Sequence, residues 1–154
     1  MNLIGAFRNA GFEAVADAVS EFFEQRQDLQ RPGVAFGPGL DSEPAKVSTD
    51  ISLVAIDRSD AEAFALAQLI LRGVTAGLDR FLQERPLFRD CCPDQALFVN
   101  PIFNLQHYDP GQGFKRWHCD WTISDEATEP VNRVLAWILY CNSVEAVSYT
   151  HLRA

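Results

Sequence analysis

A histidine and an aspartate two residues apart, His118 and Asp120, have the types and spacing to hold a metal ion. In a β-strand, side chains alternate between the two faces, so this spacing puts both on one face and Cys119 on the other. An imidazole and a carboxylate directed into one cavity are two of the three ligands of the facial triad that holds non-haem Fe(II). The alternative is a hydrogen-bonded pair on the surface of a strand. A metal site also needs a third ligand from elsewhere in the chain.

The composition is typical of a single globular domain. The 154 residues are 47% hydrophobic and 22% charged, enough for one buried core. The net charge of −8 argues against nucleic-acid binding, because Lys and Arg are needed to replace phosphate counterions. The sequence shows neither a signal peptide nor an uninterrupted apolar run of membrane-spanning length. We therefore expect a cytoplasmic protein that binds neither nucleic acid nor membranes.

The four cysteines do not form a pattern typical of metal binding. They stand at positions 91, 92, 119 and 141, without a CxxC pair or a cysteine–histidine spacing for structural zinc. We expect reduced thiols, packed as small hydrophobic side chains in a reducing compartment.

Two amphipathic helices are predicted in the first 90 residues. The first covers residues 11–29, where apolar side chains recur at helical spacing. The second opens at Ser59 or Asp60, with Glu62 placed to complete a capping box from Ser59. It ends at Arg85-Pro86, because proline cannot continue a helix. We expect the two helices to pack on one side of a sheet formed by later residues.

Extended segments dominate the second half of the chain. A short candidate strand covers residues 46–53. Residues 98–108 are rich in aromatic and β-branched side chains and lead to a strong turn signal at 109–113. The next strand is expected at 114–121, and 131–142 contains an uninterrupted apolar run that predicts a strand buried on both faces. Helices followed by strands predict an α+β fold.

Three sequence patterns follow one another between residues 108 and 142. They are Tyr-x-Pro-Gly-x-x-Phe from Tyr108, His-x-Asp from His118, and Arg-Val-Leu-Ala-Trp-Ile-Leu-Tyr-x-Asn from Arg133. A lone His-x-Asp occurs by chance, but the three together resemble the first half of the catalytic barrel of 2-oxoglutarate- and Fe(II)-dependent dioxygenases, in the prolyl-4-hydroxylase-like group. Residues 46–53 are also similar to a segment of bacterial members.

The resemblance implies a fold, a reaction and roles for individual residues. The fold would be N-terminal helices packed on an incomplete double-stranded β-helix, a jelly-roll, cupin-like barrel. His118 and Asp120 match iron ligands, Tyr108 and Tyr140 match residues that bind 2-oxoglutarate, and Trp121 is a candidate substrate-lining residue. The implied reaction hydroxylates a C–H bond, of a peptidyl (prolyl-type) substrate for instance, with O2 and decarboxylation of 2-oxoglutarate to succinate. Ascorbate is a further candidate cofactor.

The chain departs from the family pattern near its end. We assign residues 1–145 to the N-terminal helices and the first half of the oxygenase domain. Residues 146–154 resemble translated sequencing-adapter read-through and are expected to be non-native, so neither His151 nor Arg153 takes a family role. The third iron ligand and the basic residue that pairs with 2-oxoglutarate are then expected beyond this chain. We expect this fragment to be inactive as it stands.

Plainer interpretations remain for each of these residues. Tyr108 and Tyr140 could be ordinary tyrosines at the edge of a core, His107 is expected to be structural, and Trp121 could serve packing alone. A second function from a different class is a jelly-roll module that binds a ligand without metal or catalysis. A third, a non-iron hydrolase or isomerase on a cupin-like barrel, would need additional His or Glu ligands that the sequence does not offer.

Overall fold

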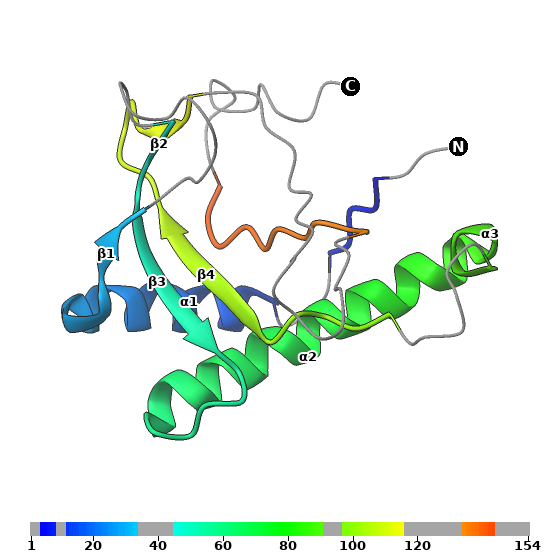
Figure 1. The fold of residues 1–154 in the computed structure, drawn as a ribbon, viewed down its shortest axis with the longest axis horizontal. Helices are drawn as coiled ribbons and strands as arrows, with labels where there is room; N and C mark the ends of the chain where they lie inside the picture. Colours follow the sequence, from blue (N-terminus) through cyan, green and yellow to red (C-terminus); the bar gives the residue numbers. More distant parts are fainter. Residues whose placement is uncertain (1–3, 9–11, 34–44, 91–96, 116–133, 144–154) are drawn as a thin grey trace, which may run out of the picture. The chain divides into compact units, whose positions relative to one another are not determined.

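The computed structural model describes residues 4–8, 12–33, 45–90, 97–115 and 134–143 (Figure 1). The chain divides into two compact units built from interleaved segments. Unit 1 comprises Met1–Gln25, Leu53–Phe103 and Leu139–Ala154, and unit 2 comprises Arg26–Ser52 and Asn104–Ile138. Helices and small antiparallel sheets together confirm the α+β fold class, and the described strands form no closed barrel.

Unit 1 contains the three α-helices of the described residues: α1 (Phe12–Gln25), α2 (Ala61–Glu84) and α3 (Pro86–Asp90). In α1, Val15, Val19 and Phe22 are buried, as their spacing on one helix face predicts. A short 3₁₀ helix, η1 (Gln27–Leu29), follows α1 and begins unit 2. The helix predicted over residues 11–29 is therefore confirmed, with its last turn tightened into a 3₁₀ helix.

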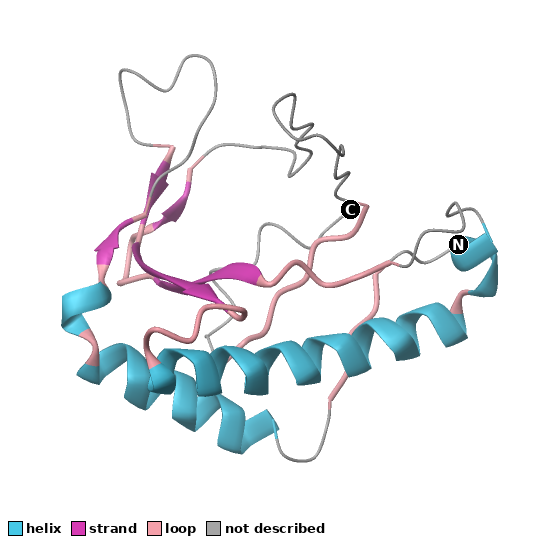
Figure 2. Cartoon of the chain, turned by 60° about the horizontal axis from the view of Figure 1, so that its bottom comes forward, coloured by secondary structure: helices cyan, strands magenta, loops and turns pink. Residues whose placement is uncertain are grey.

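Helices α1 and α2 lie side by side (Figure 2). A glycine in the middle of α2 permits this approach, because a Cβ on Gly73 would lie 3.0 Å from the Phe12 ring. The core of α2 consists of Leu66, Ala67, Ile70 and Phe81. Gly73 lowers the intrinsic helix propensity of α2, but it makes room for an aromatic side chain of the neighbouring helix.

The N-terminus of α2 differs in one detail from the prediction. Asp60 is the N-cap, and its Oδ1 accepts hydrogen bonds from the backbone N–H groups of Glu62 (3.1 Å) and Ala63 (3.0 Å). The capping box from Ser59 was therefore wrong. The Ser59 N–H instead donates to Asp57 Oδ1 at 2.8 Å, which places Ser59 in the turn before the helix. At the other end, α2 stops at Glu84, as predicted from Arg85-Pro86. Pro86 begins a further short helix, α3, which was not predicted.

By length and composition alone, α2 is apolar enough to cross a membrane. Arg72 and Asp79 interrupt its apolar run, so the sequence analysis did not recognise it as a candidate span. The core helix of a soluble protein meets the same criterion, and the finding carries no conclusion about location.

The described residues contain five short strands, which form two small sheets. They are β1 (Arg31–Pro32), β2 (Lys46–Val47), β3 (Thr49–Val54), β4 (Ile102–His107) and β5 (Gly113–Phe114). One sheet has the order β1-β3-β4 and the other the order β2-β5. Figure 1 shows β3 and β4 running in opposite directions. The strands predicted over residues 46–53 and within 98–108 are confirmed.

Residue pairs define the register of two strand pairings. Between β1 and β3, Arg31 pairs with Asp50 and Pro32 with Thr49. Between β2 and β5, Lys46 pairs with Phe114 and Val47 with Gly113. Between β4 and β5 the chain makes the predicted turn, in which the Gln112 N–H donates to Asp109 O at 2.9 Å. Gly111 has a φ of 86°, a conformation that glycine adopts without a Cβ penalty.

The predicted strand over residues 131–142 is wrong for its described part. Residues 134–140 form no strand, and they alternate between exposed and half-buried. Ile138 is 69% exposed, so the run is not buried on both faces. A continuous apolar run becomes a buried strand only where neighbouring strands cover both of its faces. No described strand pairs with residues 134–140.

Several predictions fall outside the described residues. They concern His118, Asp120, Trp121, the cysteines at 91, 92 and 119, most of the strand at 114–121, and the tail from residue 146.

Candidate functional site

Tyr108 stands directly after β4 and before the tight turn that leads to β5. It is 39% exposed. Its hydroxyl donates a hydrogen bond to Gln106 Oε1 at 3.1 Å, two residues earlier on the same face of the extended chain. The phenol is therefore partly covered and partly accessible, as a ligand-binding tyrosine must be.

A buried polar cluster lies in the same unit as Tyr108. Lys46, Ser48 and Asp50 are only 7%, 7% and 9% exposed. The Lys46 ammonium donates to Asp50 Oδ2, and the Ser48 hydroxyl donates to Asp50 Oδ1 at 2.7 Å. Both oxygens of the Asp50 carboxylate thus have partners, which a buried charge requires.

Strand alternation explains why these three side chains meet. Lys46 belongs to β2 and Asp50 to β3, and Ser48 joins the two strands. In an extended segment, every second side chain points to the same face. The polar residues at 46, 48 and 50 consequently share one face, while Ile51 turns the other way into the core.

Gly33, at the end of β1, lies against this cluster. Its N–H donates to Ser48 O at 2.8 Å. A Cβ at this position would overlap the Ser48 hydroxyl and lie 2.9 Å from Asp50 Oδ1. The absence of a side chain on Gly33 is what leaves space for the hydrogen bond between Ser48 and Asp50.

The surroundings of Tyr108 disfavour its ionisation. Burial raises the pKa of the Tyr108 phenol, and the negative charge of Asp50 raises it further. A side-chain interaction with Ser48 acts in the opposite direction and lowers this pKa. The phenol therefore stays protonated at neutral pH and can donate a hydrogen bond to an anion.

Tyr140, the second predicted 2-oxoglutarate-binding tyrosine, belongs to unit 1. It is 50% exposed and stands in the extended segment 134–140. Its neighbour Cys141 is a half-buried free thiol, and burial raises the pKa of that thiol. His107 is exposed, and its Nδ1 lies 4.0 Å from Asp109 Oδ1.

The predicted iron ligands His118 and Asp120 lie outside the described residues, as does Trp121. Among the residues that the structure does describe, no group of three His, Cys, Asp or Glu side chains could hold a metal ion. The one carboxylate of the polar cluster, Asp50, is already paired with an ammonium and a hydroxyl. This cluster does not fit a metal, and we assign it no metal-binding role.

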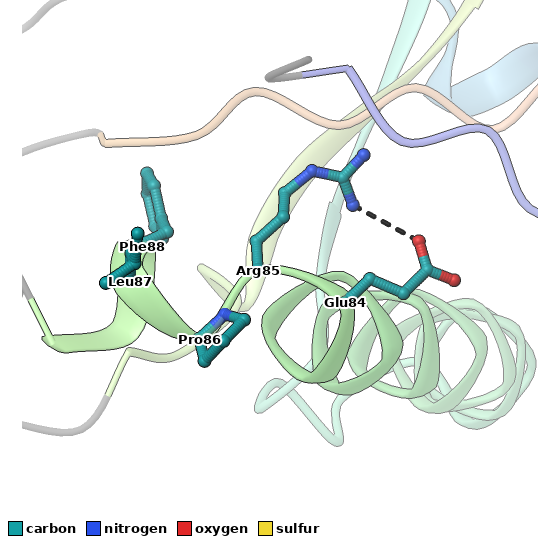
Figure 3. Close-up of a pocket in the computed structure, with 5 residues that line it drawn as sticks. All are labelled: Glu84, Arg85, Pro86, Leu87 and Phe88. Atoms are coloured by element: carbon teal, nitrogen blue, oxygen red, sulfur yellow. Dashed lines mark hydrogen bonds and ion pairs between the residues drawn. The ribbon is translucent and has the colours of Figure 1, made fainter. Parts of the chain in front are cut away.

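A small pocket in unit 1 offers no better candidate. It lies where α2 meets α3, has a volume of about 180 Å³, and is lined by Glu84, Arg85, Pro86, Leu87 and Phe88 (Figure 3). Sites for drug-sized ligands are usually of about 300 Å³ or more. The Arg85 guanidinium, its main polar group, already contacts Glu84 at 3.2 Å, the backbone oxygen of Ile4 at 3.0 Å and the Phe81 ring. These contacts stabilise the helix junction.

Comparison with protein-family models, with curated proteins and with solved structures found no match for this chain.

An extended piece was predicted over residues 46–53, but its buried polar cluster was not. A signal was present, because polar side chains stand at positions 46, 48 and 50. A charged residue at every second or fourth position of a strand usually marks a solvated face, so burial of these side chains could not be expected from the sequence.

Proposed function

We propose that the chain belongs to a non-haem Fe(II)- and 2-oxoglutarate-dependent oxygenase, which hydroxylates a C–H bond and converts 2-oxoglutarate to succinate. The observation that carries this proposal is the environment of Tyr108. This tyrosine is a partly exposed, protonated hydrogen-bond donor at the start of the segment that leads through β5 to His118 and Asp120. Its proton, which is donated to Gln106 Oε1 in the structure, would turn to one carboxylate of 2-oxoglutarate when this ligand binds.

In this proposal each residue has a limited role. His118 and Asp120 are two of the three iron ligands, and Tyr108 and Tyr140 bind the 2-oxo acid. Trp121 is a candidate substrate-lining residue, and a peptidyl, prolyl-type residue is the candidate substrate. Bound iron and 2-oxoglutarate supply the oxidising chemistry, while the protein binds and orients them and excludes water. We further propose that β3 and β4 are strands of a jelly-roll barrel.

The first test of this proposal is anaerobic binding of Fe(II) and 2-oxoglutarate to the chain. We expect an iron-dependent visible absorbance from the metal–oxo-acid chelate, which His118→Ala and Asp120→Ala abolish because each removes an iron ligand. His107→Ala is the matched control, since this histidine lies beside Asp109 on the surface and should leave the signal unchanged.

Each result of this titration decides between functions. An undiminished chelate signal in both ligand variants would refute the assignment of His118 and Asp120. Binding of 2-oxoglutarate that is equally tight with and without iron would favour the metal-free binding module. Succinate formed by the 154-residue chain itself would support the oxygenase and would contradict the expectation that this fragment is inactive.

A further inference from the structure

A short segment ahead of α1, residues 4–8, lies against the C-terminal part of α2, and both belong to unit 1. The segment belongs to no helix or strand, so regular backbone pairing does not hold it in place. Its contacts with α2 instead involve side chains of the helix and of Arg85, the residue that ends it.

Two arginines hold the segment at two points. The Arg85 guanidinium donates a hydrogen bond to the backbone oxygen of Ile4 at 3.0 Å. The Arg80 guanidinium lies over the Phe7 ring, 5.1 Å from its centroid, which is a cation–π contact. The two contacts therefore fix a backbone carbonyl and the aromatic ring that follows three residues later.

One carboxylate, that of Glu84, positions both arginines. Its Oε1 accepts a hydrogen bond from Arg80 Nε at 3.0 Å, and its Oε2 accepts one from Arg85 at 3.2 Å. Figure 3 shows the Arg85 guanidinium directed toward Glu84. We call these three residues the arginine clamp.

A glycine in the segment permits close contact with the helix. A Cβ on Gly5 would lie 2.8 Å from the Phe7 ring and 3.0 Å from the Phe81 ring. Phe81 is only 6% exposed, and the Arg85 guanidinium lies over its ring at 4.4 Å. The segment thus helps to cover an aromatic surface of α2, beside the clamp.

The clamp is a weak fastening. The side chains of Arg80 and Glu84 are 55% and 45% exposed, and ion pairs in contact with water contribute little to stability. We propose that the C-terminal part of α2 is a peptide-docking site, and that residues 4–8 are its resident, detachable occupant. The site selects a peptide with an aromatic side chain three residues after an accessible carbonyl. Arg80 and Arg85 touch the peptide, and Glu84 is a positioning residue.

The first experiment follows Phe7 in the full chain. 4-Fluorophenylalanine is placed at position 7, and its ¹⁹F NMR signal is compared with that of a synthetic peptide of residues 1–8 with the same label. We expect the two signals to differ, because the docked ring lies against a guanidinium. Glu84→Gln should move the chain's signal toward that of the peptide, since both arginines lose their carboxylate partner. Asp79→Asn is the matched control: it removes a charge from an exposed position of the same helix and should leave the signal unchanged.

The second experiment vacates the site. Phe7→Ala removes the ring of the resident segment, and circular dichroism should show unchanged helices, because Phe7 lies outside them. We expect the labelled peptide to bind this variant with its signal at the docked position. Its affinity for the native chain should be lower by roughly tenfold or more, because the resident segment competes within the molecule at a high effective concentration.

The possible results separate the parts of the proposal. A native signal at the free-peptide position, or one that Glu84→Gln does not move, would overturn the clamp. Failure of the peptide to bind Phe7→Ala, or equal affinity for this variant and the native chain, would overturn the docking site. A docked signal that depends on protein concentration would indicate exchange between two copies and overturn occupation within one chain. Iron and 2-oxoglutarate take no part in these measurements, so their outcome is independent of the oxygenase proposal.

Discussion

Gly33 shows how one missing side chain can organise a site. It permits the close approach of β1 to the Ser48–Asp50 hydrogen bond, and no other residue type would leave that space. At this scale the cluster depends on the absence of one methyl group, because protein interiors are packed too densely to absorb it.

We predict that Gly33→Ala destabilises the protein by about 1–3 kcal/mol, the usual cost of overpacking. Urea unfolding of the variant would measure this. The matched control is the double variant Gly33→Ala/Ser48→Ala, in which the atom that blocks the new Cβ is removed. A double-mutant cycle should then show partial rescue. Simple additivity of the two substitutions would contradict the close contact.

Tyr108 should make stability depend on alkaline pH. Its pKa in the folded protein is raised above the ordinary value of 10.0. A proton held more tightly in the folded state stabilises it fully below the unfolded pKa, and this stabilisation is lost as the pH rises through the folded pKa. We expect the urea midpoint to fall in this alkaline range in the native chain and to fall less in Tyr108→Phe. Equal alkaline losses in both would show that Tyr108 is not the responsible group.

At the scale of single elements, two neighbouring residues at the N-terminus of α2, Ser59 and Asp60, can be compared as helix caps. The Asp60 carboxylate accepts two backbone N–H groups that would otherwise lack partners, whereas the Ser59 side chain caps nothing in the structure.

We predict that Asp60→Ala costs about 1 kcal/mol of stability, the typical value of an N-cap. Ser59→Ala should change stability by much less. Thermal or urea unfolding of both variants would distinguish the two caps. A larger loss in Ser59→Ala than in Asp60→Ala would restore the capping box that the sequence suggested.

Local signals predicted the helices and turns better than they predicted the sheets. The apolar spacing of α1, the stop at Pro86 and the turn at Gly111 are decided within a few residues, and all three were confirmed. The strand predicted over residues 131–142 was wrong for its described part, because burial of a strand depends on distant partners. The buried cluster around Asp50 was missed for the same reason, since β1 and β4, which flank β3, come from elsewhere in the sequence. Of the candidate site, the structure describes Tyr108 and Tyr140, whereas the iron ligands stay predictions.

At the scale of the whole molecule, strands β3 and β4 are shared between the two units. The boundaries fall within β3, between Ser52 and Leu53, and within β4, between Phe103 and Asn104. Each of these strands therefore contributes residues to both units.

We predict that the two units unfold in one cooperative transition. Far-ultraviolet circular dichroism follows the helices, which lie mainly in unit 1. The NMR signal of a ¹³C label at Cζ of Tyr108 follows unit 2. Their urea midpoints should coincide. Two separate midpoints would show that the units are independent despite the shared strands.

The pairing of β3 with β4 also governs how the chain folds as it is synthesised. Strand β3 leaves the ribosome well before β4, because α2 and α3 lie between them in the sequence. Local helices can form in that interval, but the sheet must wait for a contact between distant segments, which is slow to form. Until then β3 has one edge without its final partner, and the long α2 helix gives the nascent chain an ordered segment during this delay.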